Sequence, residues 1–166
     1  MDFKILDELE IFLQKLIDSQ QAIHEKNTSL IQKEINRFLS AHPADEELRE
    51  NVLNRIGLFY QNQLGEPNLA LEIWDELLNT DGYSEFLWKN KMSCYQSLGL
   101  WEQALASFLL LEQREFSIDY LFQGKAEILR KLGRMDDAEQ AQQVFNVYQK
   151  SEDDKWSDPN HYYNYM

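Results

Sequence analysis

The sequence contains few of the residues that break helices or cross-link chains. Its 166 residues include six glycines, three prolines and a single cysteine, Cys94. So few turn-forming residues exclude β-sandwiches and barrels, whose many turns need them, and favour long helices. One cysteine excludes an intramolecular disulfide and is compatible with the reducing cytoplasm. We therefore expect an all-α protein with a cytoplasmic location.

Basic residues and long apolar runs are also scarce. Sixteen lysines and arginines stand against 29 acidic residues, which gives a formal net charge of −13. Because binding to phosphates requires lysine and arginine, we expect no direct contact with nucleic acid. Residues 1–21 carry acids where a signal peptide carries bases, and no apolar run approaches the ~18 residues of a membrane span. We expect a protein that is neither exported nor bound to membranes.

Residue groups that perform catalysis or hold metals are missing from the sequence. The three histidines, His24, His42 and His161, lie far apart, and Cys94 falls on an apolar stripe. There is no glycine loop for phosphate, no nucleophile in a strained turn, and no histidine pair on one helix face. We expect no enzymatic activity, no cofactor and no metal site, with Cys94 as a small buried apolar residue.

The sequence does contain one stretch three times at a constant spacing. It reads LGEPNLALEIW at 64–74, LGLWEQALASF at 98–108 and LGRMDDAEQAQ at 132–142, so that its glycine and its alanine recur every 34 residues. They are Gly65, Gly99 and Gly133, and Ala70, Ala104 and Ala138. A glycine permits positive φ in a turn, and an alanine lets two helices approach to roughly 8 Å. The period predicts a two-helix unit stacked on copies of itself.

The apolar periodicity divides the chain into segments. We predict one helical domain, 1–166, made of an N-terminal helical hairpin (1–43), three repeats (44–84, 85–118 and 119–150) and a C-terminal tail (151–166). The hairpin lacks the glycine and the alanine of the repeats, so it is either a degenerate repeat or a cap. The tail is acidic and aromatic, and it either folds back over the last helix or docks on a partner.

These repeats resemble the tetratricopeptide repeat family. The resemblance rests on the 34-residue period, on the alanine of the second helix and on the bulky residue four positions later, Trp74 or Phe108, and it covers about residues 51–150. The third repeat departs from this pattern, because it has Gln142 in place of the bulky residue. In the first two repeats, Gly57 and Met92 replace parts of a mid-helix Leu-Gly pair. The terminal proline of the family pattern is missing from all three repeats. The resemblance implies a right-handed α-solenoid of stacked antiparallel helix pairs, whose first helices line a concave groove.

The resemblance also implies which residues face this groove. In related proteins they are commonly the second, fifth, sixth, ninth, twelfth and thirteenth of each first helix, counted here from Asn51, Glu85 and Asp119. The candidate binding residues are Arg55, Phe59, Asn62, Phe86, Lys89, Asn90, Gln96, Tyr120, Arg130 and Lys131. Amides would satisfy the backbone of an extended peptide, cations would meet carboxylates, and rings would hold an apolar side chain. The predicted function is a non-catalytic interaction module, an adaptor or a chaperone, that binds a partner segment.

A second hypothesis uses the acidic surface of the protein. Acids gather on the expected convex side and in the tail, where the candidate residues are Glu72, Asp75, Glu76, Asp153, Asp154, Trp156, Tyr162 and Tyr163. An acidic surface attracts basic proteins, and a small acidic protein can cover the basic cleft of a toxin or an enzyme. The alternative function is thus an immunity or inhibitor protein. Both hypotheses expect a protein or peptide partner and leave its identity and the oligomeric state open.

Overall fold

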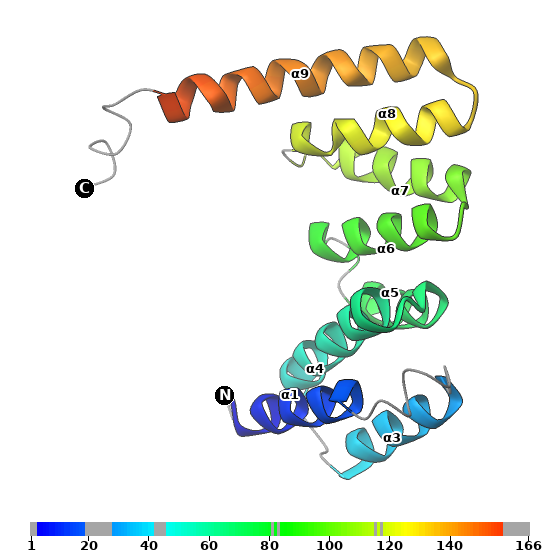
Figure 1. Cartoon of the computed structure of the whole chain (residues 1–166), viewed down its shortest axis with the longest axis vertical. Helices are drawn as coiled ribbons and strands as arrows, with labels where there is room; N and C mark the ends of the chain where they lie inside the picture. The colour runs from blue at the N-terminus through cyan, green and yellow to red at the C-terminus, as the bar shows by residue number, and fades with distance from the viewer. Residues whose placement is uncertain are drawn as a thin grey trace. The chain divides into compact units, whose positions relative to one another are not determined.

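The computed structural model of the chain describes residues 3–18, 28–41, 46–80, 82, 84–114, 116 and 118–157. Every regular element in these ranges is a helix, as Figure 1 shows, so the all-α expectation is confirmed. The chain divides into two compact units, Met1–Ser84 and Glu85–Met166, and the second begins where the sequence predicts the second repeat. In the described ranges no helix combines the length and the apolar composition needed to cross a lipid bilayer.

In the described part of the first unit there are four α-helices and one π-helical turn. They are α1 (Phe3–Asp18), α3 (Thr28–Ala41), α4 (Glu46–Leu58), η1 (Phe59–Leu64) and α5 (Pro67–Thr80). Pro67 opens α5, where its missing N–H is harmless because the first helical position has no intrahelical acceptor. In the N-terminal hairpin, Phe12 of α1 stacks on Phe38 of α3 with the ring centroids 5.1 Å apart.

Among the residues described in the second unit there are four α-helices and one 3-10 turn. They are α6 (Glu85–Ser97), α7 (Trp101–Gln113), η2 (Asp119–Leu121), α8 (Phe122–Lys131) and α9 (Met135–Ser157). A single apolar cluster joins them and includes Phe108 and Phe122, whose rings meet edge to face at 5.2 Å. Cys94 is fully buried, so its prediction as a small core residue is confirmed.

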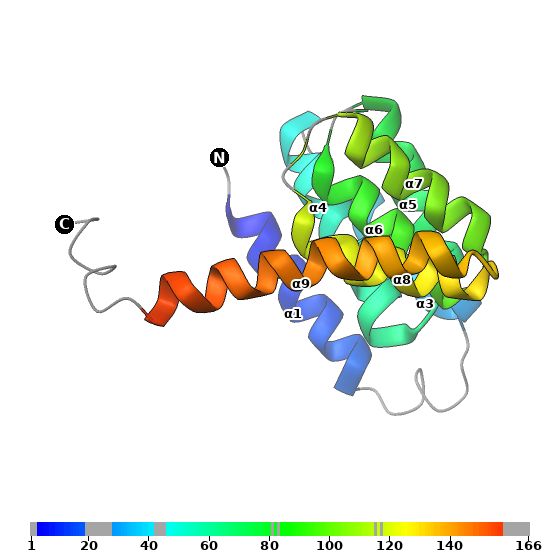
Figure 2. The same ribbon diagram turned by 90° about the horizontal axis from the view of Figure 1, so that it is seen from above.

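The last helix is longer than the sequence predicts. α9 continues to Ser157, so the predicted start of the tail at Ser151 lies inside a helix, and Figure 2 shows α9 reaching beyond α6, α7 and α8. Residues 158–166 lie outside the described ranges.

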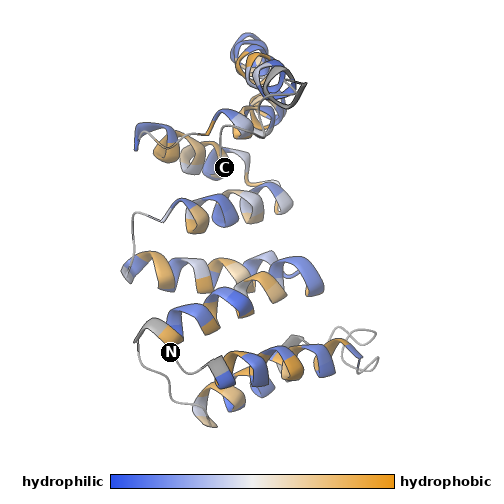
Figure 3. Ribbon diagram, turned by 90° about the vertical axis from the view of Figure 1, so that its left-hand side faces the viewer, coloured by the Kyte–Doolittle hydropathy of each residue, from blue (hydrophilic) through white to orange (hydrophobic). Residues whose placement is uncertain are grey.

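Apolar and polar residues occupy different sides of the helices, as the hydropathy colours of Figure 3 show. The apolar sides form the two cores. Fully or almost fully buried residues include Leu9, Ile35, Ile56 and Trp74 in the first unit and Leu87, Leu111, Ile128 and Leu129 in the second.

The recurring glycines form the turns between paired helices. Gly65, Gly99 and Gly133 have φ values of 64°, 70° and 74°, so the predicted positive φ is confirmed. Residues with a Cβ atom rarely adopt this conformation, which explains why glycine recurs at this position. The alanines five residues later are at most 1% exposed, as expected for residues that lie between packed helices.

The constant spacing fails in one place, just before Gly65. In the second unit the N–H of Leu100 donates to the carbonyl oxygen of Tyr95, five residues earlier, at 2.9 Å. In the first unit the N–H of Glu66 donates to the carbonyl oxygen of Tyr60, six residues earlier, also at 2.9 Å. One extra residue therefore precedes Gly65, and the π turn η1 absorbs it because its hydrogen bonds span five residues instead of four.

This extra residue changes which positions of the repeats correspond. Upstream of the inserted residue, a position in the first unit is equivalent to the position 35 residues later, so Arg55 corresponds to Asn90. The equivalence of Arg55 with Lys89, on which the groove prediction depends, is wrong. Gly57 and Tyr60 have the spacing of the mid-helix glycine and tyrosine of the tetratricopeptide pattern, and the corrected register aligns Tyr60 with Tyr95.

Gly57 brings α4 and α5 into close contact. A Cβ atom at this position would lie 2.4 Å from the Cη2 atom of Trp74 and within 2.8 Å of two further ring atoms. The ring itself is fully buried, and its Nε1 donates a hydrogen bond to Oε1 of Gln61 at 3.2 Å. Because the Trp74 ring is buried and its Nε1 is hydrogen-bonded to Gln61, it cannot easily move away from α4, and only glycine fits at position 57.

The substitution Gly57→Ala is therefore expected to destabilise the fold. Alanine is favoured over glycine in a helix by about 1 kcal/mol, but the added methyl group overlaps the Trp74 ring, and overpacking a core costs about 1–3 kcal/mol. Gly124→Ala in α8 is the matched control, because its added Cβ would make an ordinary 3.9 Å contact with Gln96. Urea unfolding should show a loss of stability for the first variant and a gain of up to about 1 kcal/mol for the second. Equal gains in both would contradict the close contact.

Candidate partner-binding surfaces

Three side chains of the second unit form a polar cluster at the start of α6. The Nζ atom of Lys89 donates to the hydroxyl oxygen of Tyr120 at 2.5 Å, and this hydroxyl donates to Oε1 of Glu85 at 2.7 Å. The same Nζ atom lies 3.7 Å from Oε1 of Glu85 and 4.7 Å from the centroid of the Tyr120 ring. Burial raises the pKa of Tyr120, and the hydrogen bond from Lys89 opposes this shift. The cluster joins η2 to α6 and already pairs the charge of Lys89.

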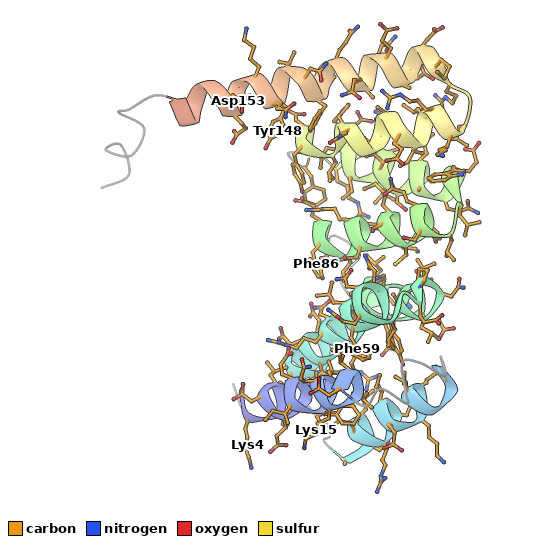
Figure 4. The ribbon with its side chains drawn as sticks, in the orientation of Figure 1. Lys4, Lys15, Phe59, Phe86, Tyr148 and Asp153 are labelled. Atoms are coloured by element: carbon orange, nitrogen blue, oxygen red, sulfur yellow. The ribbon has the colours of Figure 1, made fainter. Side chains whose placement is uncertain are left out.

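Further predicted residues continue this surface along α6. Side chains three, four or seven positions apart share one face of a helix; Phe86, Lys89 and Asn90 follow the shorter steps, and Gln96 follows Lys89 after seven. Phe86, labelled in Figure 4, is 44% exposed, and its carbonyl oxygen accepts a hydrogen bond from Nδ2 of Asn90 at 2.9 Å. We call Phe86, Lys89, Asn90, Gln96 and Tyr120 the α6 face. The second unit brings Phe86, Lys89, Asn90 and Tyr120 together, and Gln96 lies two helical turns further along α6.

The two remaining candidates of this unit, Arg130 and Lys131, lie at the far end of α8. Nη2 of Arg130 donates to Oε1 of Gln142 in α9 at 3.0 Å, and Nζ of Lys131 lies 5.7 Å from the Trp101 ring centroid. The length of α8, roughly 15 Å, separates them from Tyr120. Both side chains thus make their contacts with other helices, α9 and α7.

The candidates of the first unit line a separate cleft. Arg55, Phe59 and Asn62 belong to the walls of a cleft of about 280 Å³ between α1 and the α4–η1 segment. Arg55 forms an ion pair with Glu10 of α1, so its charge is met within the unit. Phe59 is only 4% exposed and is mainly a core residue, whereas Asn62 is exposed. The cleft therefore lacks the free positive charge that the sequence predicts.

The acids of the alternative hypothesis lie on α5 and α9. Glu72, Asp75 and Glu76 are exposed on α5, and Glu76 accepts a hydrogen bond from Nη2 of Arg49 at 2.7 Å in an ion pair with α4. Asp75 also has an interaction within the chain. Asp153 is exposed on α9.

The other candidates of that hypothesis lie partly or wholly outside the described residues. Asp154 and Trp156 belong to α9, and their side chains lie outside the description. Tyr162 and Tyr163 lie outside the described residues altogether.

Sequence reasoning missed a second surface of the later unit, along α9. Val144 and Val147 are 39% and 71% exposed, although both are apolar. A comparison between repeats could have found Val147, because Gln113 stands 34 residues before it. An apolar residue at a position that is polar in the preceding repeat is a signal for a surface with its own role.

In the described ranges no group of three or more histidine, cysteine and carboxylate side chains could hold a metal ion. Comparisons of the chain with protein-family models, with curated proteins and with solved structures find no match. The chemistry of the surfaces themselves is thus the basis for a function. An exposed ring, neighbouring amides and a paired lysine are groups that suit binding.

The burial of Tyr60 in the first unit makes stability depend on pH. Tyr60 is 3% exposed, and burial, reinforced by the carboxylate of Glu72, raises its pKa from 10.0 to about 12. In the unfolded chain the pKa returns to its ordinary value, so the unfolded state loses the phenolic proton first as the pH rises. The contribution is fully present below pH 10 and is lost toward pH 12, which amounts to about 2–3 kcal/mol.

Urea unfolding at neutral pH and near pH 11.5 measures this effect. Tyr60→Phe removes the titrating group, so its stability should fall by about 2 kcal/mol less than that of the unmodified chain over the same pH range. Other tyrosines and the lysines titrate in both proteins and cancel in the difference. Equal losses in the two proteins would show that Tyr60 ionises as easily in the folded state as in the unfolded state.

Proposed function

We propose that the protein is a non-catalytic interaction module whose α6 face binds a segment of a partner protein. The recurring glycine turns, the buried alanines and the corrected register of Gly57 and Tyr60 support a right-handed α-solenoid of the tetratricopeptide type. In such a solenoid the first helix of each pair, here α6, belongs to the binding side.

The observation that carries this proposal is the exposed ring of Phe86 beside an ordered polar cluster. A ring that is 44% exposed gains free energy when a partner covers it, and aromatic anchors of this kind dominate many interfaces. The hydroxyl of Tyr120 is held between Lys89 and Glu85, so these side chains lose little entropy on binding. The neighbouring amides of α6 can hydrogen-bond to the backbone of an extended segment.

The segment that suits this surface is apolar and extended rather than acidic. Lys89 is paired with Glu85, and Arg55 is paired with Glu10. A partner carboxylate would have to displace an existing ion pair, and such an exchange between exposed charges gains at most about 1 kcal/mol. The expectation of a basic groove that binds carboxylates is accordingly replaced by an aromatic and amide surface.

The alternative function, neutralisation of a basic toxin or enzyme, has less support on α5. Glu76 is paired with Arg49, and Asp75 has an interaction within the chain. Acids that already interact within the chain attract a basic partner less strongly. We therefore favour the α6 face over the acidic side of α5.

A single substitution on the α6 face tests the proposal. The tagged full chain is used to capture partners from the cell of origin, mass spectrometry identifies them, and the affinity of one partner is measured with purified proteins. Phe86→Ala should weaken binding at least tenfold, or about 1.4 kcal/mol, because truncation of an aromatic anchor commonly costs more than 1 kcal/mol.

Leu100→Ala is the matched control for this measurement. Leu100 is an apolar residue of similar exposure, 39%, but it precedes α7 and lies outside the α6 face. Both variants should keep the helical circular-dichroism spectrum of the unmodified chain. The proposal would be wrong if the partner bound Phe86→Ala as tightly as the unmodified chain. It would also be wrong if both variants lost binding to the same extent.

A further inference from the structure

The outer side of α9 carries an exposed apolar strip. Val144 and Val147 of α9 are 39% and 71% exposed, and Leu109 of α7 is 46% exposed. We call these three residues the α9 strip. Val144 lines two clefts, one of about 320 Å³ shared with Leu109 and one of about 570 Å³ that also includes Asp119 of η2. The strip thus lies between two hollows that can accept the side chains of another molecule.

α9 is also longer than the segment that supports it. It has 23 residues, whereas η2 and α8, on which it packs, have 3 and 10. About ten residues, roughly 15 Å, therefore extend past η2. Figure 1 shows this overhang, and Figure 4 labels Asp153 on it. Most helical stability in proteins comes from tertiary packing, so a partner that covers this overhang would stabilise it.

The strip differs from the preceding repeat at Val147, whereas Val144 has an apolar equivalent, Leu110. The position equivalent to Val147 in α7 is Gln113, which is exposed and polar. Conversely, Phe108 of α7 is fully buried in the core, while its equivalent in α9 is Gln142, whose amide oxygen accepts a hydrogen bond from Arg130. α9 is thus polar at Gln142, where Phe108 of α7 packs on the next helix, and it is apolar at Val147, where α7 has the polar Gln113.

The charges around the strip that lack an ion pair are mainly acidic, because Lys125 and Arg134 of the smaller cleft pair with Glu112 and Asp137. The side chains described on α9, residues 135–153, include five acids and one base, Lys150. Asp119 of the larger cleft, Asp136 and Asp153 have no ion pair among the residues that the structure describes. Asp153 also lies near the C-terminal end of the helix, where the helix dipole disfavours negative charge. Cationic side chains would therefore be attracted to both ends of the strip.

We infer that the α9 strip binds an amphipathic helix of a partner protein, with an apolar face and lysine or arginine on both flanks. Gln140, Val144, Val147 and Ser151 follow one another at steps of four, three and four residues, which is the seam on which a second helix packs. The seam covers about three turns of α9. This inference goes beyond the proposed function, because it concerns another surface and a partner segment of different chemistry.

Charge distinguishes this occupant from two others. A second copy of the chain carries a net charge of −13 and would be repelled by the acids around the strip. Residues 158–166 of the same chain contain one acid and neither lysine nor arginine. A cationic segment of another protein meets the acids that these occupants leave unpaired.

A designed peptide tests the inference with the full chain. The probe is a fluorescent helical peptide of about 18 residues, with leucines on one face and lysines on both flanks. Its binding is followed by fluorescence anisotropy at low salt. Val147→Lys should weaken binding at least tenfold, because it removes an apolar contact and repels the flanking lysines. Met135→Lys is the matched control, since Met135 is 61% exposed on the same helix but outside the strip. The affinity of this variant for the peptide should stay within twofold of that of the unmodified chain.

A second peptide with the same leucines and with glutamates in place of the lysines should bind at least tenfold more weakly than the first. Failure of the lysine peptide to bind, or equal binding to both variants, overturns the inference. A dimer that Val147→Lys dissociates would assign the strip to a second copy and overturn it too. So would a tenfold gain in peptide affinity after removal of residues 158–166, which would assign the strip to the chain itself. Because Phe86 enters none of these measurements, they can fail while the α6 face stands.

Discussion

Both units depend on the close approach of helices at residues with little or no side chain. Ala104 and Ala138 are at most 1% exposed, and Gly57 leaves no room for a methyl group beneath Trp74. At this separation the helices bury large apolar side chains completely, and such burial is the main favourable contribution to folding. The same contacts fix the rotation of each helix and so decide which residues face the solvent, Phe86 on α6 and Val147 on α9 among them.

Most of the fold could be predicted because its signals are local. A glycine that ends one helix and an alanine five residues later depend on sterics within a few residues, and apolar spacing marks the buried side of each helix. The extra residue before Gly65 has only a weak signal, because Tyr60 stands five residues before Gly65 whereas Tyr95 stands four residues before Gly99. It leaves the composition and the spacing of the landmarks downstream unchanged, and the hydrogen bond from Glu66 to Tyr60 reveals it. The length of α9 was missed for a related reason, since an acidic helix end resembles the start of a tail.

The candidate site could be predicted only in part. Phe86, Lys89 and Asn90 share a face because helix geometry requires it. The partners of the charged side chains could not be predicted, because they come from distant parts of the chain. Glu10 lies 45 residues from Arg55, and Tyr120 lies 31 residues from Lys89. Long side chains find such partners only after the helices have packed, so two of the predicted positive charges, Arg55 and Lys89, are paired with carboxylates in the folded chain.

The wide turn at the end of the first unit's α4 segment bears on how repeats of this kind can diverge. In an ordinary helix an inserted residue rotates everything before it by about 100°, which would move core side chains into solvent. Here the π turn absorbs the insertion, so that Gly57 stays under Trp74 on one side and Gly65 keeps its turn on the other. Changes in length are tolerated at this point because the core is already closed on both sides of it. Lineages of such repeats can therefore alter their exposed surface by insertion as well as by substitution.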